Sequence, residues 1–209
     1  MVEHTTETRA AEVDAVILVG GQGTRLRPLT VSTPKPMLPT AGHPFLSHLL
    51  ARIAKAGMRH VVLGTSYKAE VFEEYFGDGS ELGLEIEYVV EEEALGTGGA
   101  IRNVYDRLRY DTAMVFNGDV LSGADLGAIL NTHIEGDADV TLHLVRVPDP
   151  RAFGSVPTDA EGRVLEFLEK TEDPPTDQIN AGCYVFKREV IAGIDAGRVI
   201  SVEPVSYTH

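Results

Sequence analysis

The residues best suited to chemistry lie in one stretch near the N-terminus. It runs Leu18-Val-Gly-Gly-Gln-Gly-Thr-Arg-Leu-Arg-Pro-Leu-Thr30 and is followed by Pro34-Lys-Pro-Met-Leu-Pro39. Glycines lack the Cβ atom that would keep a nucleotide away from the backbone, and their N–H groups can point at phosphate oxygens; here they are Gly20, Gly21 and Gly23. Arg25 adds a planar cation for a triphosphate, and prolines on both sides of Lys35 stiffen its backbone and pre-place the ammonium. The stretch predicts a loop that binds a nucleoside triphosphate.

Other glycine-rich loops fit this stretch less well. The dinucleotide-binding pattern G-x-G-x-x-G, counted from Gly21 and Gly23, needs a glycine where the chain has Leu26. The phosphate loop of P-loop proteins needs Gly-Lys followed by Ser or Thr, and the sequence contains no such run. A tight turn also explains a glycine cluster by itself, so the interpretation depends on the cations and prolines that accompany the glycines.

A second candidate group is the carboxylate of Asp119, in the run Phe116-Asn-Gly-Asp-Val120. The run ends an apolar segment, 112–117, that is typical of a buried strand, so Asp119 is expected at the carboxyl edge of a sheet, beside the glycine loop. A carboxylate there suits Mg²⁺, which prefers oxygen ligands shared with substrate phosphates. The alternative is an Asp in a turn beside Gly118. The glycine loop on the same edge favours the metal.

The elements that must position these groups alternate between strands and helices. Before residue 135, apolar strands are predicted at 15–19, 60–65, 85–90 and 112–117, and helices at 44–57, 68–76, 97–108 and, after a capping box at Ser122-Gly-Ala-Asp125, to about 134. Later strands are predicted at 140–146, 164–169 and 179–186. The pattern predicts an α/β fold with a doubly wound, mostly parallel sheet, to which a smaller, partly antiparallel region is added.

Composition restricts the class of protein. The chain has 209 residues, 43% of them hydrophobic, which suits one domain, and its net charge of −14 argues against a nucleic-acid partner. One cysteine permits no internal disulfide, which fits a cytoplasmic protein. No segment has the length of a membrane span, so no membrane partner is expected. Residues 1–12 are polar and lack the apolar core of a signal peptide, so they are predicted to form a disordered extension.

The glycine stretch also carries a resemblance. Gly-Gly-x-Gly-Thr-Arg-Leu-x-Pro-Leu-Thr followed by Pro-Lys-Pro resembles the signature of the sugar nucleotidyltransferases, also called NDP-sugar pyrophosphorylases, and the resemblance covers about residues 14–203. It implies that the loop, with Thr24, binds the NTP, and that Arg25 grips the phosphates. It also implies that Lys35 stabilises charge on the transferred phosphoryl group and the leaving pyrophosphate. Asp119 matches the metal-binding aspartate of the family, with Mg²⁺ as the cofactor.

The segment from Tyr88 to Gly99 is similar to the base-recognition segment of the family, where uridylyl- and thymidylyltransferases usually carry Gln at the position of Glu91. A carboxylate only accepts hydrogen bonds, and guanine offers two adjacent donors, so Glu91 favours guanine. Gly96 and Thr97 begin a predicted helix whose free N–H groups can line the nucleoside pocket. The alternative for Glu91 is a solvated residue in the charge run 91–93.

Three later segments resemble the sugar-phosphate site of the family: Phe153-Gly-Ser155, Glu166-Phe-Leu-Glu-Lys170 and Ile179-Asn-Ala-Gly182. The resemblance implies that Glu169 binds sugar hydroxyls, that Lys170 binds the 1-phosphate, and that Gly154 and Asn180 contact the sugar. Two alternatives remain. The Glu–Lys pair is also common as an exposed pair at a strand end, and Asn180 as a turn former.

Together these features are most similar to the guanylyltransferases of the family that act on mannose 1-phosphate. The implied reaction is in-line attack of mannose 1-phosphate on the α-phosphorus of GTP, giving GDP-mannose and pyrophosphate. The alternatives are a thymidylyl- or uridylyltransferase acting on glucose 1-phosphate, and a non-catalytic regulatory homologue that binds nucleotide or sugar phosphate. The family usually adds a second metal aspartate in a Trp-x-Asp-x-Gly segment, and this chain has no Trp. The catalytic domain, 13–203, is therefore expected to be truncated, with 204–209 as a non-matching tail and a homo-oligomer possible for a full-length form.

Overall fold

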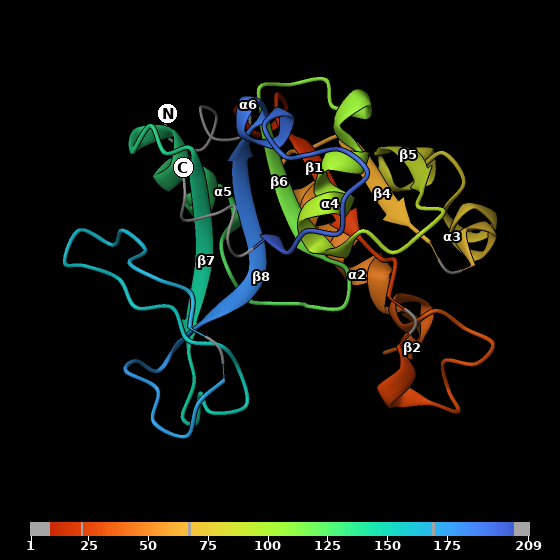
Figure 1. The fold of residues 1–209 in the computed structure, drawn as a ribbon. Coiled ribbons are helices and arrows are strands. Elements are labelled where there is room, and N and C mark those ends of the chain that lie inside the picture. Colours follow the sequence, from red (N-terminus) through yellow and green to blue (C-terminus); the bar gives the residue numbers. More distant parts are fainter. Residues whose placement is uncertain (1–8, 22, 67, 169, 203–209) are drawn as a thin grey trace.

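A computed structural model describes residues 9–21, 23–66, 68–168 and 170–202, and it contains one central sheet of six strands (Figure 1). The strand order is β5-β4-β1-β6-β8-β7. Every strand runs parallel to β1 except β8, which is antiparallel to both of its neighbours. The bounds are β1 Asp14–Leu18, β4 His60–Thr65, β5 Glu85–Val90, β6 Thr112–Asn117, β7 Val140–Arg146 and β8 Gln178–Lys187.

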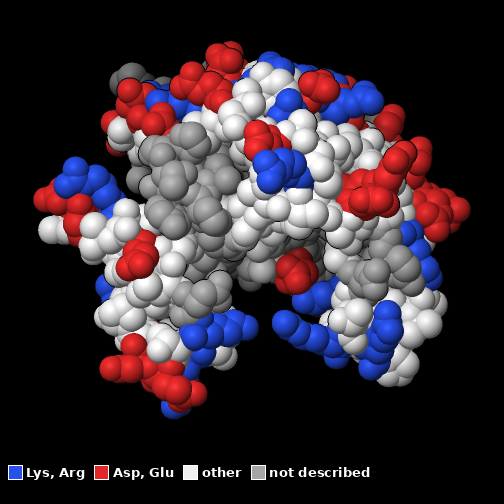
Figure 2. All heavy atoms as spheres, in the orientation of Figure 1, with Lys and Arg blue, Asp and Glu red and all other residues white. Residues whose placement is uncertain are grey.

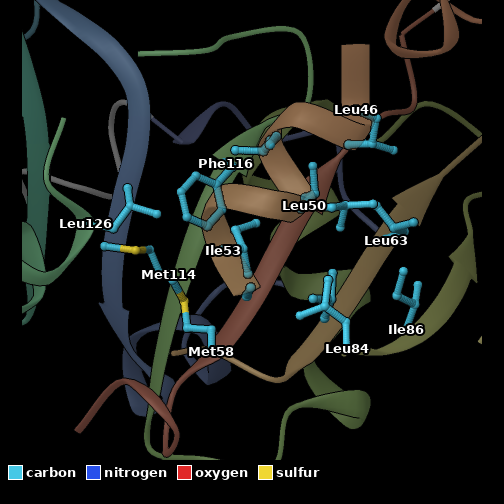
Figure 3. Close-up of a cluster of buried hydrophobic side chains, with 14 of the residues drawn as sticks. Leu46, Leu50, Ile53, Met58, Leu63, Leu84, Ile86, Met114, Phe116 and Leu126 are labelled. Atoms are coloured by element: carbon cyan, nitrogen blue, oxygen red, sulfur yellow. The ribbon is translucent and has the colours of Figure 1, made fainter. Parts of the chain in front are cut away.

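Helices cover both faces of this sheet, because its central strands are apolar on both sides. Val16 of β1 packs in one cluster with residues of α4 and α6, whereas its neighbours Ala15 and Ile17 pack with α2, α3 and α5. Figure 3 shows Leu50 and Ile53 of α2 lying over the face of the sheet that α2, α3 and α5 cover. The helices are α2 Phe45–Lys55, α3 Ala69–Phe76, α4 Gly96–Asn103, α5 Leu126–Glu135 and α6 Arg188–Ala192.

Two irregular segments extend from the edge of the sheet at which the parallel strands end (Figure 1). One follows β1 and includes the short helices η1 Thr24–Leu26 and η2 Lys35–Met37, and the two-stranded ribbon of β2 Pro39–Thr40 and β3 His43–Pro44. The other, residues 147–177, joins β7 to β8 and is ordered by isolated bridges such as Ser155 to Leu168. Figure 2 shows that the surface is hollowed between these two lobes.

The predicted fold class is confirmed, and the structure corrects several details. The later strands join the main sheet beside β6 instead of forming a separate layer. The strand predicted at 164–169 is wrong, since the described residues there make only isolated bridges. Asp125, not Ser122, is the N-cap of α5, because its carboxylate accepts the Ala128 N–H at 3.1 Å. The helix predicted at 97–108 ends at Asn103, and the short helix η4 Tyr105–Arg107 follows.

The described chain begins at Arg9, and Ala10 is already 1% exposed within the core. Packing therefore begins before Val13, where the sequence predicts the ordered chain to start. The lone cysteine, Cys183, is buried, and burial raises the pKa of its thiol to about 12. Among the described residues, no helix is long and apolar enough to cross a bilayer.

Candidate active site

The glycine loop leaves the end of β1 and is held by hydroxyl groups of neighbouring residues. Thr30 Oγ1 donates to the Gly23 carbonyl at 2.7 Å, and Ser66 Oγ donates to the Gly20 carbonyl. Gly23 has a φ of +59°, and a Cβ atom on Gly20 would lie 2.9 Å from Ser66 Oγ. Gly23 therefore has a backbone conformation that favours glycine, and a side chain at Gly20 would require Ser66 to shift.

A single cavity of about 560 Å³ lies against this loop and the adjacent strand ends. Every residue that the sequence predicts for catalysis, nucleotide binding or metal binding lines it: Gly20, Gly21, Gly23, Thr24, Arg25, Lys35, Glu91, Gly96, Thr97 and Asp119. On the face in Figure 2, Lys and Arg side chains border the hollow from both lobes, although the chain is strongly acidic overall. This local excess of positive charge is suited to phosphates.

Lys35 and Asp119 form an ion pair across the cavity, with Nζ 2.6 Å from Oδ2 and both side chains partly exposed. Gly118 makes this geometry possible, because its N–H donates to the Leu18 carbonyl at 2.9 Å and a Cβ atom would collide with Val19 Cγ1. The Val120 N–H also donates to the Asn117 carbonyl at 3.1 Å, so Asp119 lies in a turn. The two alternatives for this residue are therefore compatible: it is a turn residue whose carboxylate faces the cavity.

The residues present are compatible with Mg²⁺ only if a substrate supplies part of its coordination. No group of three or more His, Cys, Asp or Glu side chains with metal-ligand geometry occurs in the described part of the chain. Mg²⁺ is commonly held by one or two carboxylates together with substrate phosphates and water. Asp119 fits the role of a single protein ligand in such a site, and Lys35 now occupies one side of its carboxylate.

Glu91 lies at the other wall of the cavity, directly after β5. Its N–H donates to the Thr65 carbonyl at 2.7 Å, and its carboxylate accepts a hydrogen bond from the Leu95 N–H. Partial burial raises the pKa of this carboxyl group above its ordinary value, and the Leu95 N–H opposes part of the rise. Glu92 and Glu93 are exposed, as expected for a solvated pair. Glu91 is thus set apart from its neighbours as a half-buried acceptor facing the cavity.

The start of α4 corrects one expectation. The Gly98 and Gly99 N–H groups, predicted to be free for a nucleoside, both donate to the Ile200 carbonyl, at 2.8 and 3.3 Å. Ile200 belongs to a segment, Arg198–Val202, that we call the strap. The strap also donates from the Ile200 N–H to the Leu95 carbonyl and from the Val202 N–H to Thr97 Oγ1, both at 2.9 Å. The helix start therefore packs against backbone, although Gly96 and Thr97 still line the cavity.

Of the residues predicted for sugar binding, the three that the structure describes, Gly154, Lys170 and Asn180, do not line this cavity. A Cβ atom on Gly154 would lie 2.7 Å from the Leu168 carbonyl oxygen, so Gly154 allows two backbone segments to approach closely. Lys170 is exposed. Asn180 lies within β8; its side chain accepts the Gly182 N–H at 2.9 Å and donates to the Tyr184 hydroxyl at 2.5 Å, so its polar atoms are used inside the strand. Glu169 lies outside the described residues.

One cavity residue that the sequence analysis missed is Asn117. It is the last residue of β6, two positions before Asp119, and it lines the cavity. Gly182 of β8 has a φ of +68°, and a Cβ atom there would lie 2.8 Å from Asn117 Nδ2. The strand end before Asp119 was a signal for Asn117, whereas the contact with β8 requires a pairing between distant strands.

A mostly parallel α/β sheet, with a glycine loop, two basic side chains and a carboxylate gathered at the strand ends, defines a protein that binds a phosphorylated ligand. The comparison with known families is more specific. Residues 14–199 match the family named Nucleotidyl transferase, and the chain belongs to that family.

Several relatives are known. The chain is 73% identical over 192 residues to a mannose-1-phosphate guanylyltransferase of Mycobacterium tuberculosis, covering 92% of this chain and 54% of that enzyme. It is 38% identical to a D-glycero-alpha-D-manno-heptose 1-phosphate guanylyltransferase of Aneurinibacillus thermoaerophilus, covering 85% of this chain and 76% of that one. The crystal structure of HddC from Yersinia pseudotuberculosis in complex with GMP-PN matches with a TM-score of 0.79 at 31% identity, covering 91% and 83% of the two chains. The chain thus spans about half the length of the mycobacterial enzyme.

Proposed function

We propose that this chain carries the nucleotide-transferring site of an enzyme that joins GTP and mannose 1-phosphate into GDP-mannose and pyrophosphate. The observation that carries the proposal is the meeting of Arg25, Lys35, Glu91 and Asp119 with the glycine loop on one cavity. The 73% identity to a mannose-1-phosphate guanylyltransferase supports both substrates. The bound GMP-PN in the HddC structure supports a guanine nucleotide at the corresponding site.

Glu91 supports guanine on chemical grounds. Its two carboxylate oxygens accept, and guanine presents N1–H and the N2 amino group as adjacent donors. The Glu91 side chain is half-buried in the cavity wall, so part of its freedom is already lost before the base binds. Uracil and thymine present carbonyl acceptors on the matching edge, and the Glu91 carboxylate would repel these.

The reaction needs no side-chain nucleophile. An oxygen of the sugar 1-phosphate attacks the α-phosphorus, the bond from that phosphorus to the bridging oxygen breaks, and pyrophosphate leaves with its electrons. Arg25 and the glycine-loop amides bind the triphosphate, and Lys35 stabilises the charge that develops as pyrophosphate departs. When bound, Mg²⁺ would be held by Asp119 and would neutralise phosphate charge. Lys170 would bind the 1-phosphate of the sugar. These substrates and the single cysteine suit a cytoplasmic enzyme.

The test is pyrophosphate release by the purified chain with Mg²⁺, with each of the four NTPs paired with mannose 1-phosphate or glucose 1-phosphate. We expect release with GTP and mannose 1-phosphate, and a rate at least tenfold lower for every other pair. Release that prefers UTP or dTTP with glucose 1-phosphate would contradict the assignment of both substrates. If calorimetry detects GTP binding but no pair releases pyrophosphate, the chain is a nucleotide-binding homologue without catalytic activity.

A further inference from the structure

The turn between β4 and α3 contains a lysine in an unusual conformation. Lys68 is the N-cap residue of α3, with φ +57° and ψ +48° in the left-handed region. Residues with a Cβ atom adopt this region at a cost, and glycine or asparagine usually occupies it. Such a residue persists where the surrounding structure demands it, and an outlier of this kind often marks a functional constraint.

The ammonium group of Lys68 reaches across to the glycine loop. Its Nζ donates to the Val31 carbonyl at 3.1 Å and to the Ser32 carbonyl at 2.8 Å. These carbonyls lie in the chain between Arg25 and Lys35, the two cations that line the cavity. Hydrogen bonds from a charged donor are stronger than neutral ones, so this contact restrains the far part of the loop.

The same turn also restrains the near part of the loop, since Ser66 Oγ donates to the Gly20 carbonyl. Between these two anchors the apolar side chains contribute little packing, because Leu29 and Val31 are 63% and 58% exposed. The position of Arg25, which is exposed on η1, therefore depends strongly on polar anchors. Lys68 is a charged anchor of this loop, in addition to the Lys35–Asp119 ion pair.

We propose that Lys68 is a positioning residue for nucleotide binding: it fixes the loop that carries Arg25 and Lys35 without contacting the nucleotide. Lys68 is not among the described residues that line the cavity, which is why the role is indirect. The expected consequence of this anchoring is tighter GTP binding, and that part of the proposal rests on the proposed function. The anchoring itself is a property of the protein without ligand, and it is testable separately.

Trypsin provides that separate test, because the loop contains one susceptible bond. Trypsin cuts after Lys and Arg unless proline follows, and both Arg27 and Lys35 precede proline. Only the Arg25–Leu26 bond is therefore cleavable between Gly20 and Pro36. Cleavage of a native protein tracks local opening, so its rate at this bond measures how firmly the loop is held. Mass spectrometry of the fragment that begins at Leu26 isolates this cut from others.

Lys68→Met removes the ammonium and keeps the aliphatic stem and the backbone conformation. We expect cutting at Arg25–Leu26 to become about tenfold faster, the scale of a lost charged hydrogen bond. Lys68→Arg should stay within about twofold of the parent chain, because a guanidinium can also donate to two carbonyls. Lys55→Met on α2, an exposed lysine outside the loop and the site, is the matched control and should change nothing. An unchanged rate for Lys68→Met overturns the proposal, whatever the chain does with nucleotides.

Lys68→Gly separates loop order from overall stability. Glycine accepts a φ of +57° without strain, so the melting temperature should stay at or above that of Lys68→Met, while cutting remains about tenfold faster than in the parent chain. If cutting rates instead follow the melting temperatures of the variants, Lys68 is merely structural and the proposal is wrong.

Loss of the Lys68 anchor is expected to weaken GTP binding and therefore to raise KM for GTP. With mannose 1-phosphate as acceptor, Lys68→Met should raise KM for GTP about tenfold and keep kcat within about threefold, with recovery in Lys68→Arg. The effect should shrink below about twofold in an Arg25→Ala background, because the two residues act through one loop. Faster cutting with an unchanged KM overturns the positioning role. If the parent chain releases no pyrophosphate, the proposed function fails, and the calorimetric Kd for GTP replaces KM. A parent chain that binds no GTP overturns both claims.

Discussion

The proposed nucleotide side of the hollow and the proposed sugar side are built differently. On the nucleotide side, the site residues come from the segment after β1, the ends of β5 and β6 and the start of α4, and these parts are joined to one another by Lys35–Asp119 and by Ser66–Gly20. On the sugar side, one long excursion, residues 147–177, contains isolated bridges, and Gly154 and Lys170 within it do not line the cavity.

This difference indicates which part of the proposed site is ordered before a ligand binds. Segments that are joined to one another by an ion pair and by hydroxyl groups can present charges at fixed positions, so binding costs little ordering there. A long excursion whose backbone hydrogen bonds lie mostly within itself is expected to order further when its ligand binds. Nucleotide recognition should therefore depend on single side chains, and sugar recognition on several weaker contacts.

The largest expected effect is on the nucleotide side. Under the proposed function, Lys35→Met removes a charge that stabilises the transition state, and it also removes the ion pair with Asp119. We expect kcat/KM to fall about 10²–10³-fold in the pyrophosphate assay, the scale of a lost electrostatic donor. The control is Lys55→Met, which should behave like the parent chain. A loss below about threefold would show that the ion pair serves structure only.

The strap gives the next largest effect. A Cβ atom in Gly99→Ala would collide with the Arg198 carbonyl oxygen and lie 2.8 Å from Leu95 Cβ. Overpacking of this kind typically costs about 1–3 kcal/mol, so the urea midpoint should fall and KM for GTP should rise. Gly123→Ala, which meets nothing within 4 Å, should change stability by less than about 0.5 kcal/mol. Equal stability of the two variants would mean that the strap can move away from the added Cβ atom without a measurable cost in free energy.

A smaller effect is expected on the sugar side. Lys170→Met should raise KM for mannose 1-phosphate about tenfold, the scale of one charged hydrogen bond, because it removes the cation that we propose binds the 1-phosphate. The calorimetric Kd for GTP should not change, since Lys170 is not among the described residues lining the nucleotide cavity. A parallel loss of GTP affinity would contradict the division into two sides.

The smallest effect concerns Glu91 and pH. Burial raises the pKa of the Glu91 carboxyl group in the folded protein. The folded state therefore binds the proton more tightly than the unfolded chain. As a result, the free energy of unfolding falls as pH rises from the ordinary pKa of 4.5 through the raised pKa. Glu91→Gln keeps an acceptor for the Leu95 N–H and removes this penalty. We expect it to be more stable than the parent chain at pH 7 by about 0.5 kcal/mol or less, a difference that disappears below pH 4.5 in urea titrations. The opposite sign at pH 7 would show that the charge is stabilising.

The same contrast determines what the sequence could predict. The apolar run 15–19 that ends in glycines predicts a buried strand, and β1, Asp14–Leu18, lies there. Asp119 and Arg25 follow strand ends, so local patterns are sufficient to bring the proposed nucleotide side together. The strand predicted at 164–169 has the right residues but no continuous partner in the sheet. Ser122 and Asp125 both have side chains suited to an N-cap. In the structure Asp125 accepts the Ala128 N–H of α5, whereas Ser122 accepts the Ala124 N–H before the helix begins.

The strap could not be predicted, because its partners are far apart in the sequence. The glycines in the run from Gly96 to Gly99 leave space at the start of a predicted helix, and the sequence predicts that this space is open to a nucleoside. The structure gives the space to the backbone of Arg198 and Ile200. A glycine in the sequence indicates that another group can lie close to the backbone, but only the tertiary fold shows which group this is.

The strap also sets an order of events during synthesis. Thr97 and Val202, which it joins, are 105 residues apart, so a ribosome adding about 5–20 residues per second makes them about 5–20 s apart. The glycine loop, β4, β5 and β6 are all made before residue 120, whereas the amides of Gly98 and Gly99 must wait for Ile200. During synthesis, the residues of the glycine loop and of β6 therefore exist seconds before the backbone that packs against the start of α4.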